Sequence, residues 1–419
     1  MAKSIIANFG TFAATDNASY FIPIAGEIKF DSGVHTARET VEIPIRTPGV
    51  LRKLRVWVAS NTATVTSTVT LLVNGSDSTL VVSIGADGVG TFVDSSHDVT
   101  IAANDKVCLR ITVPTETGTN TLTITTCSME FEPTDTTKTV QIFASAGDNP
   151  SLSTDSTTRH LVPGVMSLGS AVVEANLKFR IRTTCTILGL YVYVPTNART
   201  TDTTIGVRKN GSTTSQVATF GSGITGAQED VADTDSFAAG DDFNLQIVTS
   251  TGGGAITFAV ASVEIVSTNN TFPLCIGYAQ GIAHGPGTTL FSGVAGGLDL
   301  ESTTEDNAEI ISPFAFTASE LHYFISANTN AVSAATVTLR KNGADSALVV
   351  SVAALATGLK AETSPTSVSV AADDTLSCES DNPDPAGSIT RTWIGLLATT
   401  PSSGGVIPVL ENFRRQMRN

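Results

Sequence analysis

Few side chains in this sequence have the type and spacing that chemistry needs. Its histidines occur in unrelated local contexts, at His35, His97, His160, His284 and His322. Nucleophilic catalysis needs a Ser, Cys or Thr with a base held beside it, and the sequence lacks the G-x-S-x-G pattern. No GxxxxGK[ST] or GxGxxG motif leads from a strand into a helix. We therefore expect no enzymatic activity and no cofactor.

Metal and sugar sites also lack a clear pattern in the sequence. Acidic loops at residues 94–98, 233–235 and 379–384 offer oxygen ligands, but none follows a calcium-loop pattern. The aromatic residues that could stack on a sugar lie within alternating apolar strands, where aromatic side chains are typical of a core: Trp57, Tyr191, Tyr193, Tyr323 and Trp393. No metal site is assigned, and a glycan site in a loop cleft stays an alternative without assigned residues.

The cysteines are scattered and odd in number, at Cys108, Cys127, Cys185, Cys275 and Cys378. Cys108 and Cys127 lie symmetrically about residues 116–119, so a disulfide across a hairpin is one alternative. Free thiols in a β-rich core, made in a reducing cytoplasm, are the simpler interpretation.

Composition favours a β protein that avoids nucleic acid and membranes. The 419 residues are 41% hydrophobic and 15% charged, and they are rich in Thr, Ser, Ala, Val and Gly. A net charge of −15 disfavours binding to a phosphate backbone. No apolar run reaches the ~20 residues that cross a bilayer, and the first 20 residues lack the pattern of a secretory signal.

The elements that would position any site are repeated. An alternating strand runs into an Asn-Gly turn three times, and the turn residues are Asn74, Gly75, Asn210, Gly211, Asn342 and Gly343. Asn-Gly readily takes the positive φ angles of a tight hairpin. A second landmark, a small-residue turn with an Asp, follows each Asn after 31, 31 and 32 positions, at Asp105, Asp241 and Asp374. Because it recurs at a turn, we interpret this Asp as structural.

Further strands recur in the same order. Aromatic-rich segments at 54–61, 190–197 and 321–328 predict central strands, and segments at 40–46, 177–183 and 308–315 predict weaker strands before them. About eight strands per repeat are typical of a sandwich or jelly roll. We expect an all-β chain of three tandem antiparallel jelly-roll domains at 1–134, 135–268 and 269–400. The short joins predict that neighbouring domains touch.

Residues 401–419 differ in composition. A Pro-Ser-Ser-Gly-Gly spacer precedes a basic segment in which Leu410, Phe413 and Met417 would share one helical face, beside Arg414 and Arg415. The segment is a candidate anchor that docks on another chain. A terminus that packs back on the third domain is the alternative.

The third repeat resembles a known family of folds. It contains, in order, the segments LHYFISAN, VTLRKNG, VSVAADDTLSC and ITRTWIGLL. Their order resembles that of the strands in the jelly-roll heads of the complement and tumour-necrosis-factor superfamily. The segments are also similar to jelly-roll repeats of bacteriophage virion proteins. Val73 stands where the other repeats have Lys209 and Lys341, and no collagen stalk is present. Because those families assemble as trimers, the resemblance implies an internal pseudo-trimer made by one chain.

These expectations lead to a functional hypothesis. The chain is expected to be a non-enzymatic structural protein of a virus particle, made in the host cytoplasm and located in the virion as a capsid decoration protein or a fibre or tail component. Its partners would be other virion proteins, copies of itself, and a host-surface glycan or receptor. A receptor- or glycan-binding module, or a bacterial surface or filament protein, is the alternative.

Overall fold

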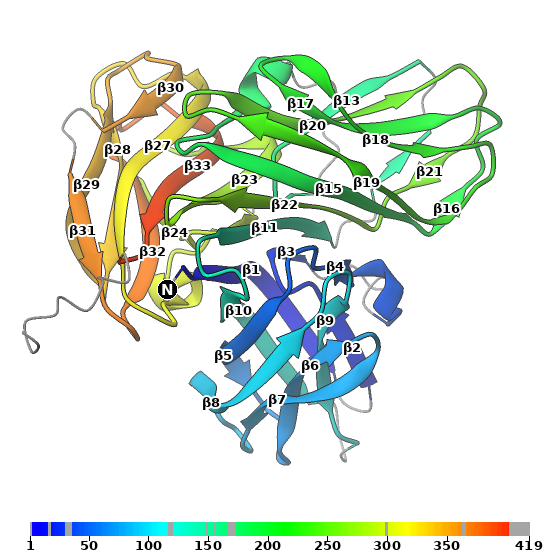
Figure 1. The fold of residues 1–419 in the computed structure, drawn as a ribbon. Helices are drawn as coiled ribbons and strands as arrows, with labels where there is room; N and C mark the ends of the chain where they lie inside the picture. Colours follow the sequence, from blue (N-terminus) through cyan, green and yellow to red (C-terminus); the bar gives the residue numbers. More distant parts are fainter. Residues whose placement is uncertain are drawn as a thin grey trace, which may run out of the picture.

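The computed structural model describes residues 2–15, 18–29, 36–115, 120–146, 150–153, 156–165, 173–297, 301–362 and 366–401. These residues form strands and short 3₁₀ turns, and no helix among them is long and apolar enough to cross a membrane. The strands group into three sandwiches in chain order (Figure 1).

The first sandwich contains β1 (Ser4–Thr15), β2 (Ala18–Ile22), β3 (Gly26–Lys29), η1 (Arg38–Thr40), β4 (Ile43–Pro44), β5 (Gly49–Asn61), β6 (Ser67–Val73), β7 (Ser76–Ile84), β8 (Gly90–Ile101), β9 (Lys106–Val113) and β10 (Thr121–Pro133). The second contains β11 (Thr139–Ala146), β12 (Ser151–Leu152), β13 (Thr158–Leu161), η2 (Glu174–Leu177), β14 (Phe179–Arg180), β15 (Cys185–Val194), β16 (Thr196–Asn197), β17 (Thr203–Lys209), β18 (Ser212–Phe220), β19 (Gly226–Phe237), β20 (Asp242–Thr249), β21 (Ile256–Thr257) and β22 (Val260–Ser267). The third contains β23 (Thr271–His284), β24 (Thr288–Ser292), β25 (Gly296–Gly297), η4 (Glu305–Ala308), β26 (Ile310–Ile311), β27 (Phe316–Asn328), β28 (Ala335–Lys341), β29 (Ala344–Val352), β30 (Gly358–Ala361), β31 (Ser367–Val370), β32 (Thr375–Asn382) and β33 (Ile389–Thr399).

Strand order is the same in all three sandwiches. One sheet of each reads β1-β10-β5-β8, β11-β22-β15-β19 or β23-β33-β27-β30, and the other reads β2-β9-β6-β7, β13-β20-β17-β18 or β24-β32-β28-β29. Apart from hairpins such as β6–β7, β17–β18 and β28–β29, most strands that follow one another in the chain lie in opposite sheets, which is the jelly-roll pattern. The predicted fold class, an all-β antiparallel jelly-roll sandwich, is confirmed.

Alternation of side chains explains why the hairpin strands form. β17 and β28 have the same burial pattern: a buried, a half-buried, three buried and two half-buried residues in succession. In β18 the last five residues alternate between buried and more exposed positions. One face of each strand therefore packs into its own sandwich, as a period of two requires.

One prediction about local structure is wrong. The weaker strands expected at 40–46, 177–183 and 308–315 shrink to the two-residue strands β4, β14 and β26, each preceded by a 3₁₀ turn. The loop residues after them contact a neighbouring sandwich instead of extending a sheet. Of the two alternatives for the cysteines, a hairpin that pairs Cys108 with Cys127 does not form, because β9 and β10 belong to opposite sheets. All five cysteines are buried and free.

The sandwiches meet where β1, β11 and β23 lie close together with β3 (Figure 1). The short strand β25 contacts β1, β3 and β23 at the same place. Three glycines at this junction have positive φ, at +88°, +88° and +113°: Gly26, Gly164 and Gly296. A Cβ on Gly26 would lie 1.6 Å from the carbonyl oxygen of Ala144, and one on Gly296 would lie 2.8 Å from that of Gly26. A side chain larger than hydrogen therefore does not fit at Gly26 or Gly296.

Candidate functional sites: turn clasps and the seams between sandwiches

The Asn-Gly turn and the downstream Asp turn contact each other directly. In the first sandwich Asn74 Nδ2 donates to Asp105 Oδ1 at 2.7 Å, and Lys106 N donates to Asn74 Oδ1 at 2.9 Å. The other carboxylate oxygen of Asp105 accepts from Ala102 N at 2.8 Å. One amide and one carboxylate thus tie together two turns that are 31 residues apart, an arrangement we name the turn clasp.

The turn clasp recurs in the second and third sandwiches with the same donors and acceptors. The amide-to-carboxylate distance is 2.7 Å in each, between Asn210 and Asp241 and between Asn342 and Asp374. Each Asn has φ +52°, the left-handed conformation expected of an Asn-Gly turn. The clasp gives the repeated Asp a hydrogen-bonding role that spacing alone did not reveal.

Charge adds to two of the three clasps. Lys209 Nζ lies 3.1 Å from Asp241, and Lys341 Nζ lies 3.6 Å from Asp374, whereas the first clasp has Val73 at this position. The donated amide of Asn210, together with Ala238 N and Lys209, lowers the pKa of the Asp241 carboxyl despite its partial burial. These side chains hold a structural turn and leave no free acid or base for catalysis.

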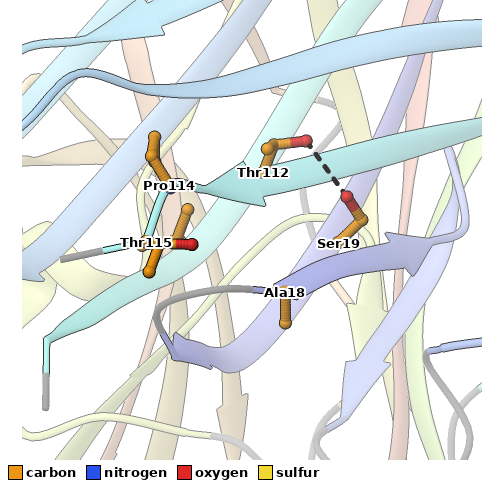
Figure 2. A pocket seen from close by; sticks show the side chains of 6 residues that line it. Ala18, Ser19, Thr112, Pro114 and Thr115 are labelled. Atoms are coloured by element: carbon orange, nitrogen blue, oxygen red, sulfur yellow. Dashed lines mark hydrogen bonds between the residues drawn. The ribbon is translucent and has the colours of Figure 1, made fainter.

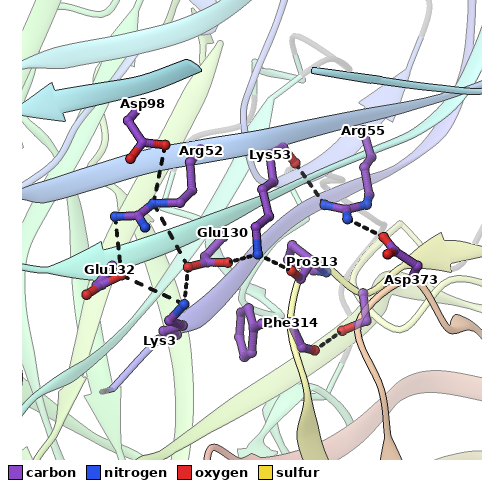
Figure 3. A network of polar contacts seen from close by, with 11 residues as sticks. Lys3, Arg52, Lys53, Arg55, Asp98, Glu130, Glu132, Pro313, Phe314 and Asp373 are labelled. Carbon is purple, nitrogen blue, oxygen red and sulfur yellow. Dashed lines mark hydrogen bonds and ion pairs between the residues drawn. The ribbon is translucent and has the colours of Figure 1, made fainter. Parts of the chain in front are cut away.

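The seam between the first and third sandwiches is ionic (Figure 3). Glu130 is fully buried and lies 2.5 Å from Lys3 Nζ and 2.9 Å from Lys53 Nζ. Arg52 reaches Glu132 at 3.2 Å. Lys53 Nζ also donates to the backbone oxygen of Pro313 in the third sandwich at 2.9 Å. Cations of the first sandwich therefore both neutralise its buried acid and bind the neighbour.

A second ionic contact extends this seam. The guanidinium of Arg55, whose side chain is 5% exposed, pairs with Asp373 of the third sandwich. Hydroxyl groups on β10 add two more bonds, from Thr126 Oγ1 to the backbone oxygen of Glu309 and from Ser128 Oγ to that of Ile311. The apolar residues Ile5, Ala7 and Phe9 of β1 pack into the core of the third sandwich.

The seam between the second and first sandwiches centres on Glu264. Its carboxylate accepts from Arg46 N at 2.8 Å, from Thr47 N at 3.2 Å and from the Thr47 hydroxyl. Burial raises the pKa of Glu264, although these hydrogen bonds act in the opposite direction. The Arg46 guanidinium forms an ion pair with the Glu229 carboxylate, with an N–O distance of 2.8 Å.

The seam between the third and second sandwiches is aromatic. The His322 ring is fully buried and stacks on Phe179 with centroids 5.8 Å apart, while Trp393 packs edge-on at 5.3 Å. Its Nδ1 contacts the backbone oxygen of Glu320 at 2.7 Å. Burial, reinforced by the positive charge of Arg182, lowers the pKa of His322 to about 3, so the ring is neutral near pH 7.

The three seams use equivalent positions. Each central strand carries a bulge residue with positive φ, Lys53 at +55°, Gly189 at +57° and Glu320 at +54°. Each bulge meets the residue that lies three positions before the central strand of another sandwich. The pairs are Lys53 with Pro313, Gly189 with Arg46 and Glu320 with Arg182. The contacts therefore close a ring, as an internal pseudo-trimer requires.

Sequence reasoning missed the bulge residues. They share no residue type, since one is Lys, one Gly and one Glu, and their common feature is a backbone conformation. The available signal was their constant place in the repeat, one residue before Leu54, Leu190 and Leu321.

A shallow hollow of about 260 Å³ lies at one end of the first sandwich (Figure 2). It is lined by Ala18, Ser19, Thr112, Val113, Pro114 and Thr115. The Ser19 and Thr112 hydroxyls lie 3.5 Å apart across it. All six lining residues are uncharged, so the hollow offers no group for acid–base catalysis.

The other candidates from the sequence have internal roles or lie outside the described residues. Asp94 accepts from Val81 N at 2.9 Å and Ser96 N at 3.0 Å, and such bonds lower its pKa to about 2 against the effect of burial. Among the residues that the structure describes, no three His, Cys, Asp or Glu side chains gather as a metal site would need. The candidate anchor, Leu410, Phe413, Arg414, Arg415 and Met417, lies outside the described residues.

The core interpretation of the aromatic residues holds in part. Tyr191, Tyr323 and Trp393 are buried, whereas Trp57 and Tyr193 are only half-buried. Lys106 Nζ lies 5.3 Å from the centre of the Tyr191 ring, across the seam between the first and second sandwiches. At least one of these aromatic residues therefore serves an internal interface.

Comparison with known proteins finds distant similarities to solved structures of viral proteins. No protein-family model matches the chain, and no curated protein sequence matches it. A solved structure titled "The Triple Jelly Roll Fold and Turret Assembly in an Archaeal Virus" is 13% identical, with a TM-score of 0.17, and the match covers 94% of this chain and 91% of that one. A protein of the Gx strain of infectious bursal disease virus is 11% identical, with a TM-score of 0.20 and coverage of 100% and 88%. A protein of Sulfolobus turreted icosahedral virus is 13% identical, with a TM-score of 0.17 and coverage of 86% and 83%. At such TM-scores the backbones do not superpose as wholes, so the jelly-roll description rests on the strand order of this chain itself.

Proposed function

We propose that the protein is a non-enzymatic structural component of a virus particle, as a capsid decoration protein or as a fibre or tail component of a phage. In this proposal the chain consists of three tandem jelly-roll domains, residues 1–134, 135–268 and 269–400, followed by a spacer and anchor at 401–419. The observation that carries it is the closed ring of three equivalent seams.

A closed ring suits a structural role for a physical reason. Each seam uses a loop of one sandwich and the bulged strand of another, so an isolated sandwich would leave both surfaces exposed. In the ring every loop meets a bulge, and one chain replaces the three subunits of a trimer. The result is a compact block that can be placed on a particle as a unit, with the free ends of three sandwiches available for contacts.

The basic segment supplies the attachment in this proposal. Leu410, Phe413 and Met417 would contact the particle through one apolar face, and Arg414 and Arg415 would pair with acidic groups of the partner. The rest of the chain is acidic, since the whole sequence including this basic segment has a net charge of −15, and it would then stay clear of the same acidic surface.

Purified particles test the proposal directly. Antibodies against the recombinant protein should label particles from a culture that produces the chain. Deleting residues 405–419 should remove the label while leaving the soluble block folded. Particles that carry no label although the chain is abundant in the same cells would overturn the structural role. Labelling that survives the deletion would overturn only the anchor.

A further inference from the structure

We propose that Asn74, Asn210 and Asn342 are latent sites of spontaneous deamidation, and that the turn clasp keeps each of them unreactive in the folded chain. The proposal is independent of the particle role. It assigns a chemical modification to the three Asn-Gly turns and a protective role to Asp105, Asp241 and Asp374.

The reaction needs only the Asn-Gly sequence and water. The backbone nitrogen of the glycine loses its proton and attacks the side-chain carbonyl carbon of the asparagine. A C–N bond forms, the side-chain nitrogen leaves as ammonia with the proton restored, and a cyclic imide results. Water then opens the imide to aspartate or isoaspartate. Glycine favours this attack because no Cβ hinders the approach of its nitrogen.

The clasp opposes the attack by holding both atoms of the reacting amide. Asn74 Oδ1 accepts from Lys106 N at 2.9 Å while Asn74 Nδ2 donates to Asp105 at 2.7 Å. The backbone N of Asn74 also donates to the oxygen of Lys106 at 2.8 Å. Turning the amide toward the glycine nitrogen breaks the two side-chain bonds, so reaction requires local opening of the turn.

The hydrogen bonds of the clasp can be made by an amide but not by the carboxylate that deamidation produces. Position 74 must both accept a hydrogen bond from a backbone N–H and donate one to a carboxylate. Aspartate at this position cannot donate when ionised, and its carboxylate would face that of Asp105 at hydrogen-bond distance. Deamidation therefore opens the clasp that had prevented it.

The three turns differ in which cation lies near the product. Lys209 and Lys341 lie beside the second and third clasps and can offset a new negative charge. The first clasp has Val73 at this position, and the Arg38 guanidinium lies against Gly75 of the same turn.

The test incubates the full chain at mildly alkaline pH and measures deamidation at each turn by peptide mass spectrometry. In the native chain all three turns should react far more slowly than in the urea-unfolded chain. Asp105→Ala should accelerate deamidation of Asn74 by about tenfold or more. A tenfold increase corresponds to a free energy of turn opening that is about 1.4 kcal/mol smaller. Asn210 and Asn342 in the same molecules serve as matched controls and should keep their native rates.

A second variant separates clasp loss from unfolding. Asp374→Ala should accelerate Asn342 alone, in a different sandwich. Equal acceleration of all three turns in either variant would assign the protection to global stability and overturn the proposal. Unchanged rates at the turn whose Asp was removed would also overturn it, as would equal rates in the native and unfolded chains.

Discussion

Two buried carboxylates show how differently a single charge can be held in this protein. Glu130 is surrounded by cations, Lys3 and Lys53, whereas Glu264 at the equivalent seam position has backbone and hydroxyl donors. The third sandwich has Leu397 at this place. The position therefore requires a side chain of suitable volume. Charge is found there only with donors around it, from cations of the same sandwich at Glu130 and from the loop of the neighbouring sandwich at Glu264.

Glu264→Gln tests this reading. One amide oxygen can accept from Arg46 N and Thr47 N, and the Thr47 hydroxyl can turn to accept from the new NH₂, so stability at pH 7 should change by less than about 1 kcal/mol. Glu264→Leu leaves the two backbone donors unpaired and should cost about 2–4 kcal/mol. Urea unfolding measures both.

The pH dependence has a defined sign. Because the folded pKa of Glu264 is raised, its contribution to stability is present in acid and is lost as pH rises through that pKa. Glu264→Gln should gain stability relative to the native chain as the pH rises above 4.5, the pKa of an unperturbed Glu. A relative loss over this range would contradict the assignment.

A fully buried ion pair in the third sandwich gives a second residue-level prediction. The Arg391 guanidinium is 0% exposed and forms paired hydrogen bonds with Glu301, whose side chain is 4% exposed. Arg391→Met strands a buried carboxylate and should destabilise the chain by about 3–5 kcal/mol. The double variant with Glu301→Leu should recover most of that loss. If the double variant is as unstable as the single one, packing and not charge explains the cost.

At the scale of elements, the turns follow from local chemistry and the long-range contacts do not. Asn-Gly at positive φ is a property of two residues, so the sequence predicts the turns at Asn74, Asn210 and Asn342. The partner of each Asn lies 31 or 32 residues later, and spacing alone could not show that the two touch.

The first strand shows a different limit of sequence reasoning. The sequence pattern does not predict β1, whose residues Ser4–Gly10 are all buried in the structure without alternation. One face packs in its own sandwich, and Ile5, Ala7 and Phe9 pack in the third. A strand that is covered on both faces loses the period of two that would reveal it.

Turn geometry provides an element-level prediction with a matched control. Gly343 has φ +72°, and a Cβ there would touch nothing within 4 Å, so Gly343→Ala tests backbone strain alone. It should cost about 1–2 kcal/mol. Gly85 is equally open but does not have a left-handed φ, and Gly85→Ala should be neutral or stabilising by up to about 1 kcal/mol. Equal effects of the two substitutions in thermal unfolding would refute the role of positive φ.

For the whole molecule, ring closure predicts a compact particle. A single compact domain of this length has a radius of gyration of about 22 Å. Small-angle scattering of the native chain should give a value close to this, apart from the contribution of the terminal segment. An elongated, bead-like envelope would show that the first and third sandwiches separate in solution, because no linker joins them directly.

The aromatic seam makes the whole assembly sensitive to acid. The folded pKa of His322 is about 3, against 6.5 for an unperturbed histidine, so the unfolded chain binds the extra proton between these values. The contribution of His322 to stability is complete above pH 6.5 and falls with decreasing pH by up to about 1.4 kcal/mol per pH unit. His284, whose pKa burial lowers to about 4, acts with the same sign inside the third sandwich.

His322→Phe isolates the part that belongs to the seam. Phenylalanine can keep the packing against Phe179 and Trp393 but cannot take up a proton. The substitution also removes the hydrogen bond to the Glu320 oxygen, which should lower the stability at pH 7 by about 1 kcal/mol. Urea unfolding from pH 7 to pH 4 should therefore show a shallower loss of stability in the variant than in the native chain, with the remaining slope due to groups such as His284.

Since the ring lies between the second and third sandwiches, acid should also loosen this seam first, which the fluorescence of Trp393 can report. Parallel pH profiles for the variant and the native chain would mean that His322 does not titrate on unfolding, and the acid sensitivity would have to come from outside the seam.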